Sequence, residues 1–85
     1  MPTRTVTVGS AVGLHARPAA IIAEAAGELD SEVTIGVPGD DPVDASSSLL
    51  IMTLGAGPGD QVEVSSDDQA ALDAIVALVE KDLDA

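Results

Sequence analysis

The sequence predicts an α+β fold in which helices cover one face of a mainly antiparallel sheet. Short segments with alternating apolar residues predict half-buried strands, and segments with apolar residues every three or four positions predict amphipathic helices. Clusters of glycine and proline mark the turns between them. The predicted order is strand, helix, strand, strand, short helix, strand, helix. The 85 residues allow one domain, over residues 1–85, with one modest core.

The first half of the chain predicts a strand, a helix and two further strands. Pro18 suits the first turn of the helix, where the missing N–H of a proline is no loss. Gly27 weakens the last turn of the same helix. The predicted elements are a strand at 3–8, a helix that runs on over 19–29, a strand at 33–37 and a short edge strand at 43–45.

The second half predicts a short helix, a strand and a long helix. The serines at 46–48 suit a helix N-cap, and the apolar run at 49–52 suits a short buried helix. Residues 66–69 are typical of a capping box, with acids at the positive end of the coming helix. The strand carries Val62 and Val64, and the helix carries Leu72, Ile75, Val76, Val79 and Leu83 at spacings of three and four.

The composition excludes several classes of protein. The chain has fifteen acidic and three basic side chains, a net charge of −12 and no aromatic residue, which argues against nucleic-acid binding. It has no cysteine for a disulfide or a thiolate. No apolar run approaches the roughly 18–20 residues of a membrane span, and the first residues do not resemble a signal peptide, so we expect a cytoplasmic protein. The acidity indicates either solubility through self-repulsion or adaptation to a high-salt cytoplasm.

Residues 13–20 differ from the rest of this acidic chain. They hold the only histidine, His15, and one of the three basic side chains, Arg17, and no acid precedes Glu24. A helix that begins here presents unpaired N–H groups and a partial positive charge, which together bind anions. The sequence therefore predicts an anion site at the start of this helix.

The chemistry that suits this site is attack of a His15 ring nitrogen on a phosphoryl group. A neutral imidazole is a good nucleophile near neutral pH. The Arg17 guanidinium and the backbone N–H groups of Ala16 and Arg17 would stabilise charge on the transferred group. No group nearby is placed to activate a water, so the phosphoryl group would wait for a second acceptor. In the simpler alternative, His15 is a surface loop histidine and Arg17 is a solvated cation.

The stretch Gly13-Leu14-His15-Ala16-Arg17-Pro18-Ala19 resembles the active-site signature of the HPr family, the histidine-containing phosphocarriers of the sugar phosphotransferase system. The resemblance covers the whole chain. It implies an open-faced β-sandwich with four antiparallel strands and three helices on one face (β-α-β-β-α-β-α). It also implies that His15 accepts phosphate on Nδ1 from phosphoenolpyruvate-charged enzyme I, with Arg17 beside it, and passes the phosphate to an enzyme IIA domain.

A protein of this kind is a stoichiometric intermediate and not a turnover enzyme, and it uses no cofactor or metal. We expect a monomer. A fructose-specific or a nitrogen-related paralogue stays open beside a general carrier. A small-ligand or metal-binding domain is a further alternative, although one histidine without cysteine or nearby acids gives too few ligands for a transition metal.

The resemblance also implies a regulatory serine at Ser47, with Ser46 as the alternative register, phosphorylated by a dedicated kinase. A regulatory relative that acts through Ser47 is therefore the second candidate function. Ser48 stands where the family usually has a bulky apolar residue, and Leu49 remains a candidate for an apolar patch. Simple N-capping by Ser46 or Ser47 would explain the same serines.

Partners are expected to dock beside His15. Residues 45–59 form a second stretch without acids, and if they pack beside the His15 loop the two stretches form one less acidic, partly apolar face. The candidate docking residues are Ala16, Ala20, Ser48 and Leu49. Val12 differs from the polar residue that better-known relatives carry before Gly13, which affects the fine geometry of the loop.

Overall fold

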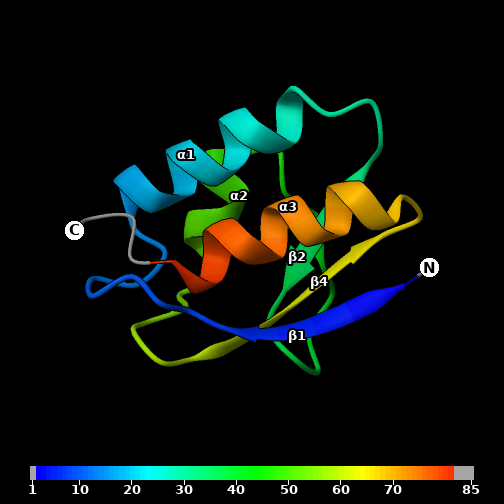
Figure 1. The fold of residues 1–85 in the computed structure, drawn as a ribbon. Coiled ribbons are helices and arrows are strands. Elements are labelled where there is room, and N and C mark those ends of the chain that lie inside the picture. Colours follow the sequence, from blue (N-terminus) through cyan, green and yellow to red (C-terminus); the bar gives the residue numbers. More distant parts are fainter. Residues whose placement is uncertain (1, 82–85) are drawn as a thin grey trace.

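A four-stranded antiparallel sheet with three helices on one face forms the structure (Figure 1). The computed structural model describes residues 2–81. The elements are β1 (Thr3–Thr7), α1 (Ala16–Gly27), β2 (Val33–Gly36), β3 (Val43–Asp44), α2 (Ser48–Thr53), β4 (Gln61–Ser66) and α3 (Gln69–Glu80). This confirms the predicted fold class and element order. No helix within residues 2–81 is long and apolar enough to cross a membrane.

The strand order β1-β4-β2-β3 places β4 between its two neighbours in the middle of the sheet. Residues that face each other across antiparallel strands point to the same side of the sheet. The pairs Val6–Val62 and Ile35–Val64 therefore put four apolar side chains on one face. The helices cover this face, and polar side chains of β1 and β4 alternate onto the open one.

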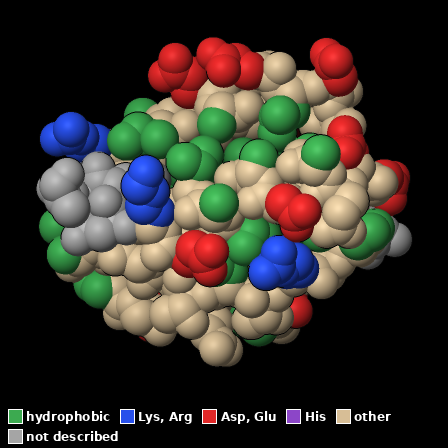
Figure 2. Space-filling view, in the orientation of Figure 1, with side chains coloured by type: hydrophobic (Ala, Val, Ile, Leu, Met, Phe, Trp, Pro, Cys, Tyr) green, Lys and Arg blue, Asp and Glu red, His purple; other side chains and the backbone are tan. Residues whose placement is uncertain are grey.

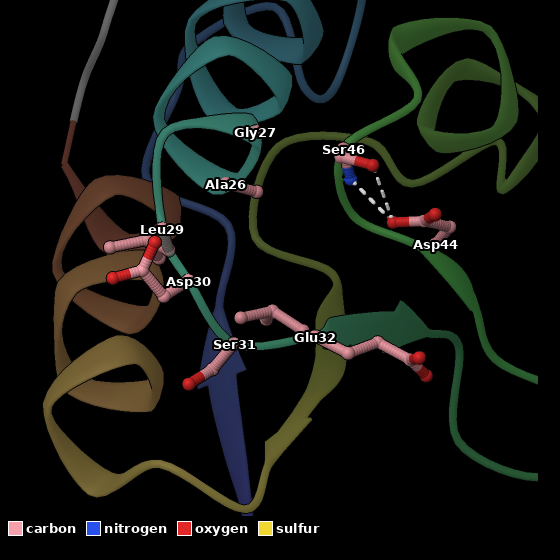
Figure 3. Close-up of a pocket in the computed structure, with 9 residues that line it drawn as sticks. Ala26, Gly27, Leu29, Asp30, Ser31, Glu32, Asp44 and Ser46 are labelled. Atoms are coloured by element: carbon pink, nitrogen blue, oxygen red, sulfur yellow. Dashed lines mark hydrogen bonds between the residues drawn. The ribbon is translucent and has the colours of Figure 1, made fainter.

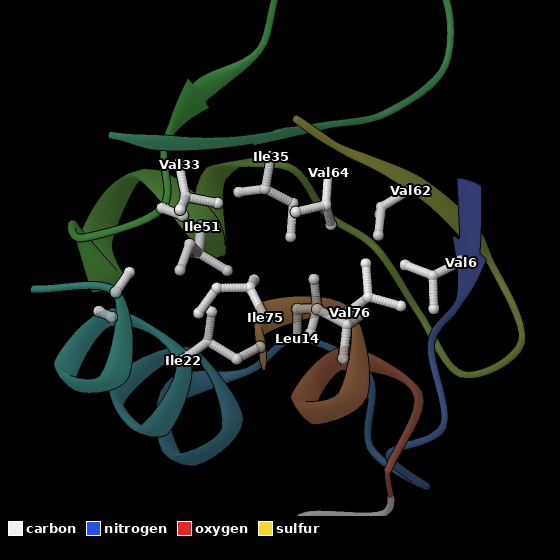
Figure 4. Packing of buried hydrophobic residues seen from close by; sticks show 14 of the residues in the cluster. Val6, Leu14, Ile22, Val33, Ile35, Ile51, Val62, Val64, Ile75 and Val76 are labelled. Atoms are coloured by element: carbon white, nitrogen blue, oxygen red, sulfur yellow. The ribbon is translucent and has the colours of Figure 1, made fainter. Parts of the chain in front are cut away.

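The core contains only aliphatic side chains, because the chain has no aromatic residue. Ile22 of α1, Ile51 of α2 and Ile75 of α3 are fully buried and meet the apolar face of the sheet (Figure 4). Leu14, from the loop before α1, points into the same cluster near Ile75. The β-branched side chains have few rotamers, so the core fixes the helices firmly over the sheet.

Pro18 lies in the first turn of α1 as predicted, because the helix begins at Ala16. The predicted end was wrong by two residues, since the helix ends at Gly27 where residue 29 was predicted. Pro18 is tolerated as the third helical residue because N–H groups of the first turn have no intrahelical acceptor. Glycine is a poor helix former, and the helix stops there, although Leu29 still packs against the core. The three predicted strands at 3–8, 33–37 and 43–45 are each one residue shorter in the structure.

The capping box predicted at residues 66–69 was also wrong. The N-cap of α3 is Asp68, whose carboxylate accepts hydrogen bonds from the N–H groups of Ala70 at 3.0 Å and Ala71 at 3.5 Å. Ser66 is instead buried as the last residue of β4, and its hydroxyl donates to the Glu32 carbonyl at 2.9 Å. Asp68 takes the N-cap position because it directly precedes α3, whereas Ser66 is part of β4 and its hydroxyl is bonded to the Glu32 carbonyl. The predicted helix residue Leu83 lies outside the described residues.

Helix α2 is far more exposed than the sequence predicted. Leu49 is 68% exposed, Leu50 and Met52 are also exposed, and within the helix only Ile51 is buried. Less than two turns of helix can turn only one of four consecutive side chains fully toward the core. The prediction of a buried helix at 49–52 was therefore wrong, and α2 presents apolar side chains to solvent.

We predict that Asp68 makes stability depend on pH in the acid range. The Ser31 hydroxyl, 2.9 Å from its carboxylate, and then the two N–H groups of α3 lower its pKa. A lowered folded pKa gives stability that is present above the unfolded value, about 3.9, and is lost as pH falls through the folded pKa. The thermal midpoint, followed by far-ultraviolet circular dichroism, should fall more steeply below about pH 4 in the wild type than in Asp68→Asn.

The Asp68→Asn variant is a matched control because asparagine caps a helix about as well as aspartate and does not titrate. Equal slopes in the two proteins would contradict the assignment of this pH dependence to Asp68.

Candidate functional site

His15 is the N-cap of α1 and leaves its imidazole free. Its backbone is extended, with φ −82° and ψ −170°, and its side chain makes no capping hydrogen bond. Its carbonyl accepts the N–H of Ala19 at 2.9 Å, which starts the helical ladder. The N–H groups of Ala16 and Arg17 precede this ladder and have no intrahelical acceptor, and Pro18 has no N–H. The exposed imidazole thus stands beside two backbone donors at the positive end of the helix.

The loop that carries His15 is fixed by the residue before it, Leu14, and by a turn at Gly13. Leu14 buries its side chain in the core, and its N–H donates to the Ala56 carbonyl at 2.9 Å. The N–H of Gly13 closes a turn by donating to the Ser10 carbonyl at 3.1 Å. His15 therefore starts from a fixed backbone, and only its side chain is left free to move.

Gly13 is required in this loop for two reasons. Its φ of +76° lies in the left-handed region that side-chain-bearing residues rarely adopt. A Cβ atom at this position would lie 2.6 Å from the Ala56 carbonyl oxygen and 2.8 Å from the Gly57 Cα. The His15 loop is therefore in close backbone contact with the loop that follows α2.

Within residues 2–81, the segment that carries the site contains no acid. Residues 9–20 contain no carboxylate, and within residues 2–81 no carboxylate pairs with the exposed Arg17. The ion pair of Arg4 with Asp73, at 3.2 Å, lies elsewhere, between β1 and α3. In Figure 2, many of the red acidic side chains lie along the top and right of the face that is shown. The positive charge of Arg17 is thus available to an anion at the start of α1.

Exposed apolar side chains lie near the start of α1 and on α2, two helices that pack against each other. We call the set the apolar face: Val12, Ala16, Ala20, Leu49, Leu50 and Met52. Val12 is 45% exposed and adds an exposed apolar side chain just before Gly13. Ser48 is half-buried. Three of the predicted docking residues belong to the face, and the sequence reading missed Val12, Leu50 and Met52 as further members.

The serines before α2 both have hydrogen-bond partners. Ser47 is the N-cap, and its hydroxyl accepts the N–H of Leu50 at 3.3 Å. The hydroxyl and the N–H of Ser46 donate to the Asp44 carboxylate at 2.7 and 2.9 Å, and these two bonds lower the pKa of Asp44. The structure thus assigns the capping role to Ser47 and a turn-closing role to Ser46.

His15 does not line either of two cavities in the structure. One of about 320 Å³ is at the opposite end of α1, between Ala26, Leu29 and Asp44, where Figure 3 shows the bond of Ser46 to Asp44. The other, about 490 Å³, lies beside the loop after α2. Within residues 2–81, no three metal-ligating side chains come together. An exposed imidazole that lines neither of these cavities suits a reaction in which a partner protein brings the second reactant.

The comparisons with known proteins decide the family. The family model described as "PTS HPr component phosphorylation site" matches residues 2–81. The chain belongs to the HPr family. It is a phosphocarrier of the phosphotransferase system, which carries a phosphoryl group on histidine between enzyme I and enzyme IIA and is not itself a catalyst.

Three relatives illustrate how far the likeness to HPr extends. The chain is 41% identical to the phosphocarrier protein HPr of Streptomyces coelicolor, over 99% of this chain and 94% of the relative. It is 43% identical to HPr of Haloferax volcanii, over 85% of each chain. The crystal structure of HPr-C-His from Thermoanaerobacter tengcongensis superposes with a TM-score of 0.83 at 34% identity, covering 94% of this chain and 92% of that one. The sequence identities and the structural superposition therefore both relate this chain to HPr over most of its length.

Proposed function

We propose that His15 carries the phosphoryl group, which it accepts from phosphoenolpyruvate-charged enzyme I and passes to an enzyme IIA sugar-permease component. The observation that supports this most directly is the exposed imidazole at the N-cap, unused by the cap itself. An unprotonated ring nitrogen attacks phosphorus, the bond from phosphorus to the donor breaks, and the donor keeps that electron pair. In the second step, a nucleophile of the acceptor attacks the phosphorus, the bond from phosphorus to the His15 nitrogen breaks, and His15 keeps that electron pair.

We expect the phosphate on Nδ1. This ring nitrogen is bonded nearer the backbone than Nε2, so a phosphoryl group on it would have the shorter reach to the N–H groups of Ala16 and Arg17. These donors and the helix dipole stabilise the negative oxygens without an added ion. No carboxylate in residues 9–20 is available to activate water, which suits a group that must be held and not hydrolysed.

Intact mass after incubation with enzyme I and phosphoenolpyruvate tests the proposal. We expect a gain of one acid-labile phosphoryl group, and coupling of phosphorus to a ¹⁵N-labelled ring nitrogen identifies Nδ1. Mass is the suitable readout because the chain has no aromatic residue to absorb near-ultraviolet light. A competent enzyme I that leaves the mass unchanged would refute the proposal.

Arg17 is proposed to stabilise the transferred group, since its guanidinium can grip two phosphate oxygens. We predict that Arg17→Gln slows phosphoryl transfer by about 100-fold, the usual effect of removing one donor to developing charge. Arg4→Gln is the matched control because it removes the same charge from β1, beside Asp73. Rapid-quench kinetics with enzyme I should separate the two variants, and equal rates for both would show that Arg17 acts only through net charge.

The apolar face is proposed as the surface on which enzyme I and enzyme IIA dock, with Ala16, Ala20, Ser48 and Leu49 among the contacts. It combines exposed apolar area with the absence of carboxylates in residues 45–59, on a molecule that is otherwise strongly anionic. Mapping of amide shifts on titration with unlabelled enzyme I tests this. Shifts confined to the open face of the sheet would overturn it.

Regulation through Ser47 is the second candidate, with a serine kinase as the partner. Its hydroxyl lies at the start of α2, next to exposed Leu49 and Leu50, so a phosphate there would add charge to the apolar face. The capping bond to Leu50 weighs against easy access, because a kinase must first draw the hydroxyl away. Mass analysis of Ser47→Ala and Ser46→Ala after incubation with the kinase and ATP decides between the two positions and no modification.

Three further proposals concern the state of the protein in the cell. We propose a monomer, which light scattering tests, and a cytoplasmic location, which cell fractionation tests. The net charge of −12 supports adaptation to a high-salt cytoplasm, where screening weakens self-repulsion. The free energy of unfolding should then rise with potassium chloride, and a flat salt dependence would count against this reading.

A further inference from the structure

The loop after α2 carries a side-chain clamp that the sequence pattern did not reveal. The Asp60 carboxylate accepts the N–H of Gly57 at 2.9 Å, and the Asp60 N–H donates to the Gly57 carbonyl at 3.1 Å. Gly55 precedes this turn, Gly59 lies within it, and both adopt positive φ. A loop rich in glycine can adopt many backbone conformations. The Asp60 carboxylate, which bonds across the turn, stabilises one of them.

This clamped turn is the support of the His15 loop. Gly57 is the residue whose Cα a Cβ on Gly13 would approach to 2.8 Å, and Ala56 supplies the carbonyl that holds the Leu14 N–H at 2.9 Å. Both contacts lie within two residues of His15 along the chain. A rotation of the Gly57 backbone would therefore move the surface on which the His15 backbone rests.

The clamp is separate from the bonds that hold the loop to the sheet. The N–H of Val8 donates to the Asp60 carbonyl at 2.8 Å, and the N–H of Gly59 donates to the Val8 carbonyl at 3.1 Å. These are backbone bonds, which any residue at position 60 can keep. Removal of the carboxylate thus frees the Gly57 peptide without detaching the loop from the end of β1.

We propose that Asp60 is a positioning residue for phosphoryl transfer. Its carboxylate fixes the Ala56–Gly57 backbone, and through Gly13 and Leu14 this fixes the backbone from which the His15 imidazole extends beside the N–H groups of Ala16 and Arg17. The inference rests on the proposed role of His15 as the phosphorylated residue. It adds Asp60, which does not touch the transferred group, to the residues that set the rate of transfer.

The test compares Asp60→Ala with Asp60→Asn, whose amide oxygen can still accept the Gly57 N–H. Asp41→Ala is the control for loss of one negative charge, since Asp41 is exposed in the turn after β2. Transfer from enzyme I to each variant is measured over a range of carrier concentrations. Amide and imidazole shifts are recorded at His15, Ala16 and Arg17, at a temperature where circular dichroism shows every variant folded.

We expect Asp60→Ala to lower kcat about tenfold with little change in KM, because the reacting group is misplaced while the apolar face is intact. The shifts at Ala16 and Arg17 should move with it, and Asp60→Asn and Asp41→Ala should stay close to the wild type. Wild-type kinetics and shifts in Asp60→Ala would overturn the proposal, as would an equal loss in Asp60→Asn or Asp41→Ala. Failure of the wild type itself to be phosphorylated would refute the role of His15 instead, and the shifts would still report on the clamp.

Discussion

Replacement of His15 by alanine is expected to abolish phosphorylation by enzyme I and to leave the thermal midpoint close to that of the wild type. The imidazole is the nucleophile in the proposed mechanism, and no cysteine or second histidine can replace it. Stability should hardly change because the side chain is exposed and makes no capping bond to α1. Intact mass after incubation with phosphoenolpyruvate and enzyme I measures the first effect, and far-ultraviolet circular dichroism measures the second.

Ser47→Ala is the matched control, since it removes a side chain at the N-cap of the neighbouring helix and leaves His15 in place. This variant should gain the acid-labile group as the wild type does and should lose about 1 kcal/mol of stability with its cap. A normal gain of mass in His15→Ala would end the assignment of the phosphoryl group to His15. In a parallel incubation with a serine kinase and ATP, an acid-stable gain lost only in Ser47→Ala would favour the regulatory function.

Substitution of Gly13 by alanine is expected to have the next largest effect, on both stability and transfer. The left-handed backbone costs a side-chain-bearing residue about 1–2 kcal/mol. The added Cβ would also meet the Ala56 carbonyl oxygen at 2.6 Å, and neither backbone can give way without disturbing the bond of Leu14 to Ala56. We expect urea unfolding, followed by circular dichroism, to show a loss at least twice that backbone cost, and phosphoryl transfer to slow at saturating carrier.

Gly39→Ala separates the two causes. Gly39 has φ +92° in the turn after β2, and a Cβ there would meet nothing within 4 Å. This variant should therefore show only the backbone cost and transfer phosphate at the wild-type rate. If Gly13→Ala and Gly39→Ala lose the same stability and both transfer normally, the close approach of the two loops has no part in positioning His15.

Much of the fold could be predicted because each local pattern agrees with the global structure. Alternating valines marked β1 and β4, and the spacing of Ile75, Val76 and Val79 marked α3. Boundaries failed where neighbouring residues compete for one role, as Ser66 and Asp68 did for the N-cap of α3. The predicted burial of α2 was wrong, because periodicity indicates which residues share a face of a helix and not whether another layer covers that face.

The candidate site could be predicted only in its local part. His15, Arg17 and the helix start are adjacent in sequence, so residue order alone brings them together. Ala56 contacts Leu14 from a segment far away in the chain, and no spacing rule encodes such a contact. The bond of Asp60 to Gly57 is local, but its proposed link to His15 passes through that same distant contact. The apolar face could be predicted only in part. Ala16 and Ala20 lie four residues apart on one helix, so their spacing predicts a shared side. The exposure of Leu50 and Met52 depends on how α2 packs, which the sequence does not indicate.

The open position of His15 determines how the protein behaves between its two partners. His15 is an exposed imidazole, and one apolar face is proposed as the docking surface for both partners. If donor and acceptor share that surface they must bind in turn, so we expect ping-pong kinetics without a ternary complex. Unphosphorylated carrier in excess then competes with its own phosphorylated form for enzyme IIA. Flux through the relay accordingly depends on how briefly each encounter lasts, and weak, short-lived docking serves it better than tight binding.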